Sequence, residues 1–272
     1  MSGASERASG ALSGASGSAG RLSPSVAGRY GLLGSGEFLP WAEPVDRWLA
    51  SSGGGRGGRV LVVPTASAPE GDEVFWRWGS MGLSHYRKLG LEPAVVELKV
   101  REDAFRPEVV AEVAGASLIF FSGGNPAYLA RTLRETPFWE AVGTAIEGGC
   151  ALAGSSAGVA YLGTVTFDPA AAATGRPPEE LWVPGLGWFR GLFGPHWDAV
   201  ERWRPGAHAM MLAAVPQDCA FLGIDEDTAV VGDGAHWEVR GRGTATVQPA
   251  GADSFVVKAG ERFDLALRSS LL

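Results

Sequence analysis

The chain contains the segment Gly149-Cys150-Ala151-Leu152-Ala153-Gly154-Ser155-Ser156-Ala157-Gly158-Val159-Ala160. Its apolar beginning is typical of a buried strand, and Val159-Ala160-Tyr161-Leu162 can form the first turns of a helix. Gly154 and Gly158 flank Ser156 in a G-x-S-x-G pattern, which suits a sharp strand-to-helix turn because such a turn tolerates only small side chains. The segment therefore predicts a strand, a tight turn and a helix, the connection from which α/β sheets are built.

A serine in such a turn projects away from the sheet. The backbone N–H groups at the start of the following helix are then free to hold an oxyanion. The alternative is a tight glycine-rich turn without chemistry, because G-x-S-x-G arises often by chance in a chain with 40 glycines. The other motifs of the chain have to decide between the two interpretations.

Strand and helix patterns alternate before this segment. Strands are expected over residues 29–33, 59–64, 94–98 and 117–121, and helices over residues 44–51, 72–89, 106–114, 127–134 and 137–147. This alternation predicts βαβ units, and therefore an α/β three-layer sandwich with a mainly parallel sheet. Loops at the carboxyl ends of parallel strands share one edge, so Gly123-Gly124-Asn125 and the Ser156 turn are expected to meet across a crevice.

The pattern is looser beyond Gly163. We expect a loop over residues 164–184, a strand that ends in a turn over 192–198 and a helix over 206–215. Short strands follow at residues 219–224, 228–231, 236–240, 244–248 and 255–258. They are expected to extend the sheet or to form C-terminal β-hairpins beside it. With no repeat or second linker visible, residues 28–272 are predicted to form a single α/β domain, and the Ser/Gly/Ala-rich residues 1–27 a disordered tail.

Composition excludes several classes of protein. The formal net charge of −7 and the lack of a basic stripe argue against a nucleic-acid partner. No apolar run approaches the ~20 residues of a membrane span. Cys150 and Cys219 lie in apolar runs without metal-ligand spacing, which is typical of core residues in a reducing compartment. We therefore expect a cytoplasmic protein. Our further expectations are a monomer or homodimer and no metal or organic cofactor.

A serine nucleophile needs a base that takes its proton and an acid that orients the base. His85 and His208 lie in helical patterns and His236 follows a glycine-rich turn, so packing roles are expected for these three. His196 differs because it follows Gly194-Pro195 at a strand end, where a rigid loop can direct it into a crevice. His196 is therefore the leading candidate for the base.

The candidate acids are Asp225, Glu226 and Asp227, which directly follow a buried strand. The alternative is an ordinary solvated turn. In chain order the serine comes first, then the histidine and then the acid. Because α/β-hydrolases place the acid before the histidine, this order disfavours a simple esterase or lipase.

Four motifs in this order resemble the cyanophycinase and aspartyl dipeptidase (dipeptidase E) family of serine peptidases. They are Phe120-Phe121-Ser122-Gly123-Gly124-Asn125, Gly154-Ser155-Ser156-Ala157-Gly158, Pro195-His196-Trp197 and Gly223-Ile224-Asp225-Glu226-Asp227-Thr228-Ala229. The resemblance covers roughly residues 30–231 and implies a fold like that of the class I glutamine amidotransferases.

The resemblance also implies roles for particular residues. Ser156 would be the nucleophile, His196 the base and Glu226 the acid. The N–H groups of Gly124 and Ala157 would form the oxyanion hole, and Asn125 would line the site.

The chain departs from the family pattern around the expected pocket. Cyanophycinases carry Gln where this chain has Pro126, and Asp-Gln where it has Gly194-Pro195. Of the arginines that follow the histidine, Arg202 and Arg204 are kept, whereas Val200 and Pro205 interrupt the series. The core chemistry is therefore expected with a different pocket.

Our hypothesis is a serine exopeptidase or dipeptidase that acts on short peptides through an acyl-enzyme, with aspartyl-containing peptides among the candidate substrates. Arg202 or Arg204 would pair with a substrate carboxylate. The alternatives are cyanophycinase-type cleavage of β-aspartyl-arginine, an amidase or amidotransferase-like hydrolase, and a non-catalytic binding scaffold. The glutaminase version is disfavoured because that chemistry uses cysteine at the turn, and Cys150 lies too early.

Overall fold

The computed structural model of the chain describes residues 28–51 and 58–267. The predicted tail, residues 1–27, lies outside the described residues, and the prediction of one domain over residues 28–272 stays a prediction. No helix within the described ranges is both long and apolar enough to cross a lipid bilayer.

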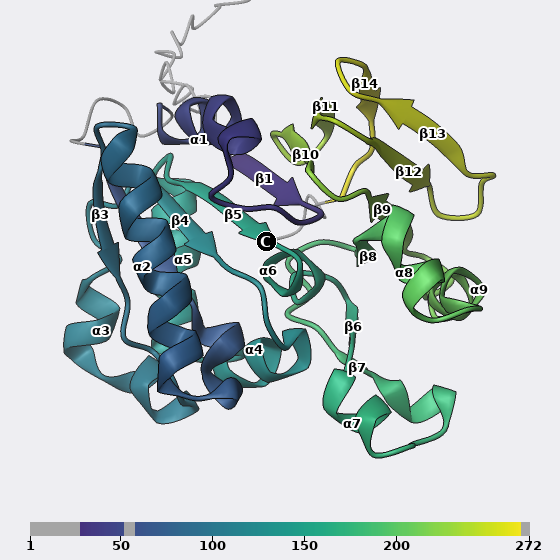
Figure 1. The fold of residues 1–272 in the computed structure, drawn as a ribbon, viewed down its shortest axis with the longest axis horizontal. Helices are drawn as coiled ribbons and strands as arrows, with labels where there is room; N and C mark the ends of the chain where they lie inside the picture. Colours follow the sequence, from purple (N-terminus) through teal and green to yellow (C-terminus); the bar gives the residue numbers. More distant parts are fainter. Residues whose placement is uncertain (1–27, 52–57, 268–272) are drawn as a thin grey trace, which may run out of the picture.

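A large mixed sheet forms the centre of the fold (Figure 1). Within the described ranges it has eight strands in the order β14-β11-β10-β1-β5-β4-β2-β3. Their bounds are β1 (Arg29–Leu33), β2 (Arg59–Val63), β3 (Glu92–Val95), β4 (Leu118–Phe121), β5 (Ala151–Ser155), β10 (Thr228–Gly232), β11 (His236–Gly241) and β14 (Arg262–Asp264). Strands β1 to β5 pair in parallel, and β10, β11 and β14 add antiparallel strands to one edge.

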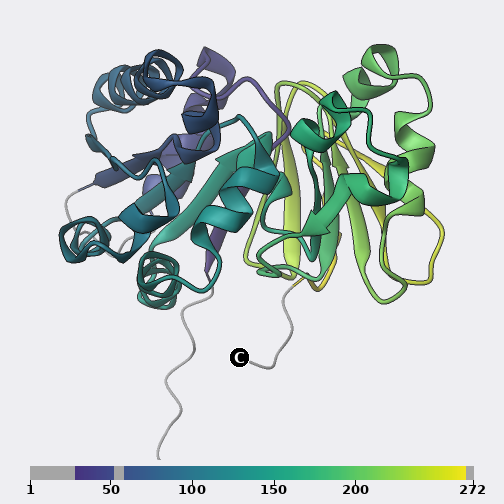
Figure 2. The ribbon, with the colours of Figure 1, turned by 90° about the horizontal axis from the view of Figure 1, so that it is seen from below.

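Helices cover both faces of the parallel strands (Figure 2). On one face, α1 (Glu43–Ala50) and α2 (Asp72–Lys88) pack Leu49 and Tyr86 in one cluster with Val62 and Phe120. On the other face, α3 (Pro107–Ala111), α4 (Pro126–Leu133) and α5 (Pro137–Glu147) pack against a second cluster that contains Phe121. Adjacent residues of β4 thus point to opposite faces and both are buried, which explains its unbroken apolar sequence. The predicted three-layer α/β sandwich with a mainly parallel sheet is confirmed.

The short C-terminal strands divide between two sheets. The hairpin of β10 and β11 extends the main sheet, as one alternative predicted. The hairpin of β12 (Thr244–Gln248) and β13 (Phe255–Lys258) instead joins β9 (Ala220–Ile224) and β8 (Gly191–Pro195). In the described part of the chain this second sheet has four strands, in the order β13-β12-β9-β8.

Two helices cover the outer face of the second sheet, namely α8 (Trp197–Trp203) and α9 (Ala207–Ala213). Trp197 and Met211 from these helices pack with Leu192 and Phe221 from the sheet. The helices therefore hold a fixed position relative to the end of β8.

Residues 164–184, expected to be a loop, contain short regular elements. They are β6 (Val165–Phe167), α7 (Pro169–Ala173), a 3-10 turn (Pro178–Leu181) and β7 (Trp182–Pro184). Phe167 and Trp182 face each other across the β6–β7 pair, with ring centroids 5.6 Å apart. The loop prediction was wrong because this pairing joins two segments that are each too short to show a pattern.

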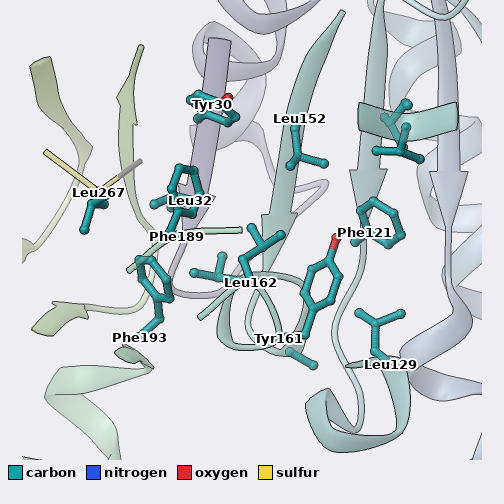
Figure 3. Packing of buried hydrophobic residues seen from close by; sticks show 14 of the residues in the cluster. Tyr30, Leu32, Phe121, Leu129, Leu152, Tyr161, Leu162, Phe189, Phe193 and Leu267 are labelled. Atoms are coloured by element: carbon teal, nitrogen blue, oxygen red, sulfur yellow. The ribbon is translucent and has the colours of Figure 1, made fainter. Parts of the chain in front are cut away.

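Aromatic packing joins the two sheets (Figure 3). Phe189 lies with its ring centroid 5.0 Å from that of Tyr30 in β1 and 5.8 Å from that of Phe193 in β8. Both contacts are edge-to-face, an arrangement that aromatic rings favour. β1 of the main sheet and β8 of the second sheet are therefore packed against a common aromatic residue.

Candidate active site

Ser156 occupies the tight turn between β5 and α6 (Ala157–Ala160), as the sequence predicts. Its backbone angles are φ 54° and ψ −113°, a conformation that costs a non-glycine residue about 1–3 kcal/mol. A Cβ atom on Gly154 would lie 1.9 Å from the carbonyl oxygen of Gly158, and one on Gly158 would lie 2.0 Å from that of Phe121. The two glycines are thus needed because strand, turn and helix approach each other too closely for any side chain.

His196 reaches Ser156 from the end of β8. Its Nε2 lies 2.9 Å from Ser156 Oγ, and its Nδ1 lies 3.0 Å from Glu226 Oε1. Its backbone adopts the left-handed conformation, with φ 54° and ψ 34°, directly before α8 begins. The strand thus ends with a sharp change of direction that turns the imidazole toward the neighbouring sheet.

The acidic run after β9 contributes one carboxylate to this chain of contacts. Asp225 Oδ2 accepts hydrogen bonds from the N–H and Oγ1 of Thr244, at 2.8 and 2.7 Å. Asp227 Oδ2 lies 3.2 Å from Arg242 Nη1. Of the three acids, Glu226 is therefore the one in contact with His196. This contact favours Glu226 among the three acids that the sequence left open.

Gly124 and Ala157 lie beside Ser156, and the structure brings their backbone N–H groups close to its side chain's cavity. Gly124 has φ +140°, and a Cβ there would lie 2.3 Å from the carbonyl oxygen of Ala66. Among the described residues, no backbone acceptor takes the N–H of Gly124 or Ala157. Both residues line the same cavity as Ser156. This arrangement can hold an oxygen that gains negative charge when a hydroxyl attacks a carbonyl group.

Glu37 is a functional candidate that sequence analysis missed. Its side chain is buried, with 5% of the residue exposed. Its Oε1 accepts the N–H of Gly123 at 3.1 Å, and its Oε2 accepts the hydroxyl of Ser155 at 2.6 Å. One carboxylate thus ties the loop before Gly124 to the strand end before Ala157. The only sequence signal was its place at the carboxyl end of the first strand, in Gly34-Ser35-Gly36-Glu37.

The residues expected to bind substrate lie in different surroundings. Both arginines are exposed, but Arg204 lines the cavity beside Ser156, whereas Arg202 is not among the described residues that line it. Asn125 caps α4, because its Oδ1 accepts the N–H of Tyr128 at 2.9 Å. The side-chain oxygen of Asn125 is therefore engaged in capping the helix. Of the three residues expected to bind substrate, the structure places Arg204 alone in the cavity wall.

The cavity beside Ser156 has a volume of about 390 Å³. Its described lining comes from the loop after β4, from α6, β8, α8 and α9, and from the segment around α7. The lining residues are Gly124, Pro126, Ser156, Ala157, Ala160, Phe167, Pro169, Phe193, Pro195, His196, Val200, Trp203, Arg204, Ala207, Met210 and Met211. The site is therefore a pocket between two sheets with Ser156 and His196 in its wall.

An ion pair fixes the α7 segment of this wall. Asp168 Oδ2 lies 2.9 Å from Arg131 Nη1 on α4, and Asp168 Oδ1 accepts the N–H groups of Ala170 and Ala171. Burial by itself would raise the pKa of Asp168. The bonds from Arg131 and from these N–H groups outweigh it, so the pKa lies below its ordinary value.

We predict that Asp168→Ala lowers the free energy of unfolding by about 1 kcal/mol at neutral pH, because a helix cap is lost. A lowered native pKa means that the carboxylate stabilises the fold above its unfolded pKa of about 3.9. This stabilisation is lost as the pH falls through the lower native pKa. Denaturant unfolding of both proteins at several pH values should therefore show a difference that shrinks in acid. A difference that stays constant with pH would contradict the ionic role of Asp168.

His85, His236 and Cys150 have partners or surroundings of their own. His85 is buried against Asp46, with 2.8 Å between Nε2 and Oδ2, and His236 lies 2.9 Å from Asp233. Burial raises the pKa of the Cys150 thiol to about 12, so this thiol is a poor nucleophile at neutral pH. In the described ranges no cluster of His, Cys, Asp or Glu side chains could hold a metal ion.

The sequence model of Peptidase family S51 matches residues 32–240, which is most of the chain. The chain belongs to peptidase family S51. It is therefore a serine peptidase, and the resemblance seen in the four motifs is confirmed.

Two curated relatives are cyanophycinases. The chain is 27% identical to the cyanophycinase of Nostoc sp. over 223 residues, which cover 79% of this chain and 72% of the relative. It is 30% identical to the cyanophycinase of Synechococcus elongatus over 202 residues, which cover 71% and 59%. Both are distant relatives, so their substrate does not transfer to this chain by similarity alone.

Two solved structures resemble the chain. A peptidase from an acI-B1 Actinobacterium matches with a TM-score of 0.80 and 33% identity, over 89% of this chain and 98% of that one. A putative Peptidase E protein from Listeria monocytogenes EGD-e matches with a TM-score of 0.55 and 17% identity, over 79% and 98%. The second likeness shows the fold alone, which is of the class I glutamine amidotransferase type.

Proposed function

We propose that the chain hydrolyses short peptides through Ser156, His196 and Glu226 by way of an acyl-enzyme. The observation that carries this proposal is the continuous contact from Ser156 Oγ to His196 Nε2 and from His196 Nδ1 to Glu226 Oε1, at 2.9 and 3.0 Å. The residues come from the ends of β5, β8 and β9, so the arrangement depends on the whole fold. Contacts of this kind let an imidazole take the serine proton while a carboxylate orients the ring.

In the proposed mechanism, Ser156 Oγ attacks the scissile carbonyl carbon as His196 takes its proton. The N–H groups of Gly124 and Ala157 hold the oxyanion of the tetrahedral intermediate. His196 then gives its proton to the leaving amine, and the C–N bond breaks. Water, activated by the same imidazole, attacks the ester and releases the acid and free Ser156.

The limited size of the pocket supports a short substrate. About 390 Å³ lies at the lower end of the ~300–1,000 Å³ range of small-molecule pockets, which suits one or two amino-acid residues. Arg204 lines the wall, is exposed, and forms no ion pair with a carboxylate in the described part of the chain. Its guanidinium can bind the free carboxylate of a dipeptide or of a peptide terminus. These features favour an exopeptidase or dipeptidase.

The test is a set of short peptides incubated with the purified protein and read by mass spectrometry. The set should include aspartyl dipeptides, β-aspartyl-arginine, neutral dipeptides and glutamine. A fluorophosphonate, which reacts with activated serines, should label the same protein on Ser156. Labelling of another serine would show that Ser156 is not the nucleophile. No labelling together with no hydrolysis would favour a scaffold without catalysis. Release of ammonia from glutamine alone would favour an amidase.

A further inference from the structure

The pocket beside Ser156 is lined mainly by apolar side chains. These side chains belong to different helices, strands and loops, and they are Pro126, Phe167, Phe193, Val200, Met210 and Met211. Among the described lining residues, Arg204 is the only one with a permanent charge, and none carries a carboxylate. Such a wall can shield a substrate side chain from water, but it can form few hydrogen bonds with it.

An exposed aromatic residue stands at the mouth of this pocket. Trp203 is 62% exposed, and its ring centroid lies 5.1 Å from that of His196. Because Trp203 adjoins the apolar lining, it enlarges a contiguous apolar surface of the kind that ligands cover. Trp203 therefore continues the apolar lining outward, next to the position where the scissile bond must lie.

We infer that the chain selects peptides with an apolar side chain, such as Leu, Met or Phe, next to the scissile bond. This inference rests on the proposed function and names its substrate class. An apolar side chain gains free energy when such a wall removes it from water. An aspartyl carboxylate would lose its hydration and meet one cation at most, and an arginyl guanidinium would meet no acid.

The two methionines suit a range of apolar shapes. Met210 is half-buried and Met211 is buried, with 9% of its surface exposed, and both belong to α9. Methionine side chains are unbranched and adapt to irregular partners. We therefore expect a broad preference for large apolar residues rather than selection of a single one.

Arg204, the charged residue of the pocket wall, is compatible with the selection of apolar side chains. Arg204 can bind the terminal carboxylate that every dipeptide carries, whatever its side chains. Binding there would direct the neighbouring side chain toward the apolar wall. The single cation is thus consistent with a peptide end beside an apolar residue, and it does not require an acidic side chain.

The test compares kcat/KM for two matched dipeptide series, one with X before alanine and one with alanine before X, where X is Leu, Phe, Asp, Arg or Ser. We expect Leu and Phe to exceed Asp, Arg and Ser by about 10- to 100-fold in one of the series, which also shows the side of the bond that the pocket accepts. Equal rates, or a preference for Asp or Arg, would overturn the inference while leaving the proposed peptidase intact. Cleavage of no peptide at all would instead count against the proposed function.

A pair of variants on α9 isolates the pocket. Met210→Glu places a carboxylate in the apolar wall and should lower kcat/KM for the Leu and Phe peptides by about tenfold or more. Ala209→Glu makes the same change at an exposed neighbouring position outside the described lining and should leave the preference unchanged. If Met210→Glu fails to fold, binding of Leu and Asp dipeptides to Ser156→Ala by calorimetry provides the same comparison. Tighter binding of the Asp dipeptide would overturn the inference.

Discussion

Replacing Ser156 with alanine is expected to lower kcat on a cleaved peptide by about a millionfold, the loss seen when a serine peptidase loses its nucleophile. The hydroxyl is 2.9 Å from His196 Nε2, and alanine leaves the imidazole with no proton to take. Alanine fits the turn, because it removes one oxygen and adds no atoms. The free energy of unfolding should therefore change little, and KM should stay within a few-fold. Single-turnover assays with high enzyme concentration can measure the residual rate.

Ser122→Ala provides a matched control for this experiment. Ser122 directly follows β4, and its buried Oγ has no hydrogen-bond partner among the described residues. Removing a buried hydroxyl without a partner is neutral or stabilising. The Ser122→Ala control should keep its activity. A loss of activity in Ser156→Ala would then be due to the loss of the Ser156 hydroxyl in particular. Full activity in Ser156→Ala would show that another group attacks the substrate.

The turn around Ser156 was predictable because steric crowding requires glycine at fixed positions on either side of the serine. The backbone of Gly158 comes so close to Phe121 that no Cβ fits, and the same holds for Gly154 against Gly158. A spacing set by such contacts can be recognised without knowing the fold. The apolar run of β4 was equally clear, because both of its faces are buried.

Contacts between segments that are distant in the chain could not be predicted from a local sequence pattern. Strand pairing placed the β12–β13 hairpin in a second sheet, although its sequence resembles that of the β10–β11 hairpin. The difference between Arg202 and Arg204 depends on where α8 ends, and helix ends are set by local capping and packing. Glu37 is 118 residues from Ser155 in the chain, and a single acid in a glycine-rich turn has no pattern of its own.

Glu37→Ala is expected to lower kcat by about 100- to 1,000-fold, the effect of losing one oxyanion-hole donor. The variant leaves the Gly123 N–H and the Ser155 hydroxyl buried without their acceptor, so both segments can shift. The Gly124 donor directly follows Gly123, and the Ala157 donor lies two residues after Ser155. A displacement of about 1 Å in either segment weakens the hold on the oxyanion. Glu37 touches no substrate in this proposal; it is a positioning residue.

The kinetic pattern separates positioning from stability alone. An oxyanion forms only during the reaction, so kcat should fall while KM stays within a few-fold. Glu37→Gln should recover part of the activity, because its amide oxygen can still accept one of the two hydrogen bonds.

Asp46→Ala is the matched control for the loss of a buried carboxylate. Asp46 accepts hydrogen bonds from His85 and Tyr86 between α1 and α2, and it is 1% exposed. Both alanine variants should lower the free energy of unfolding, because each leaves buried donors without an acceptor. Only Glu37→Ala should also lower kcat when both proteins are assayed well below their melting temperatures. If the two variants lose stability equally and both keep kcat, Glu37 holds the fold together without setting the geometry of the oxyanion hole.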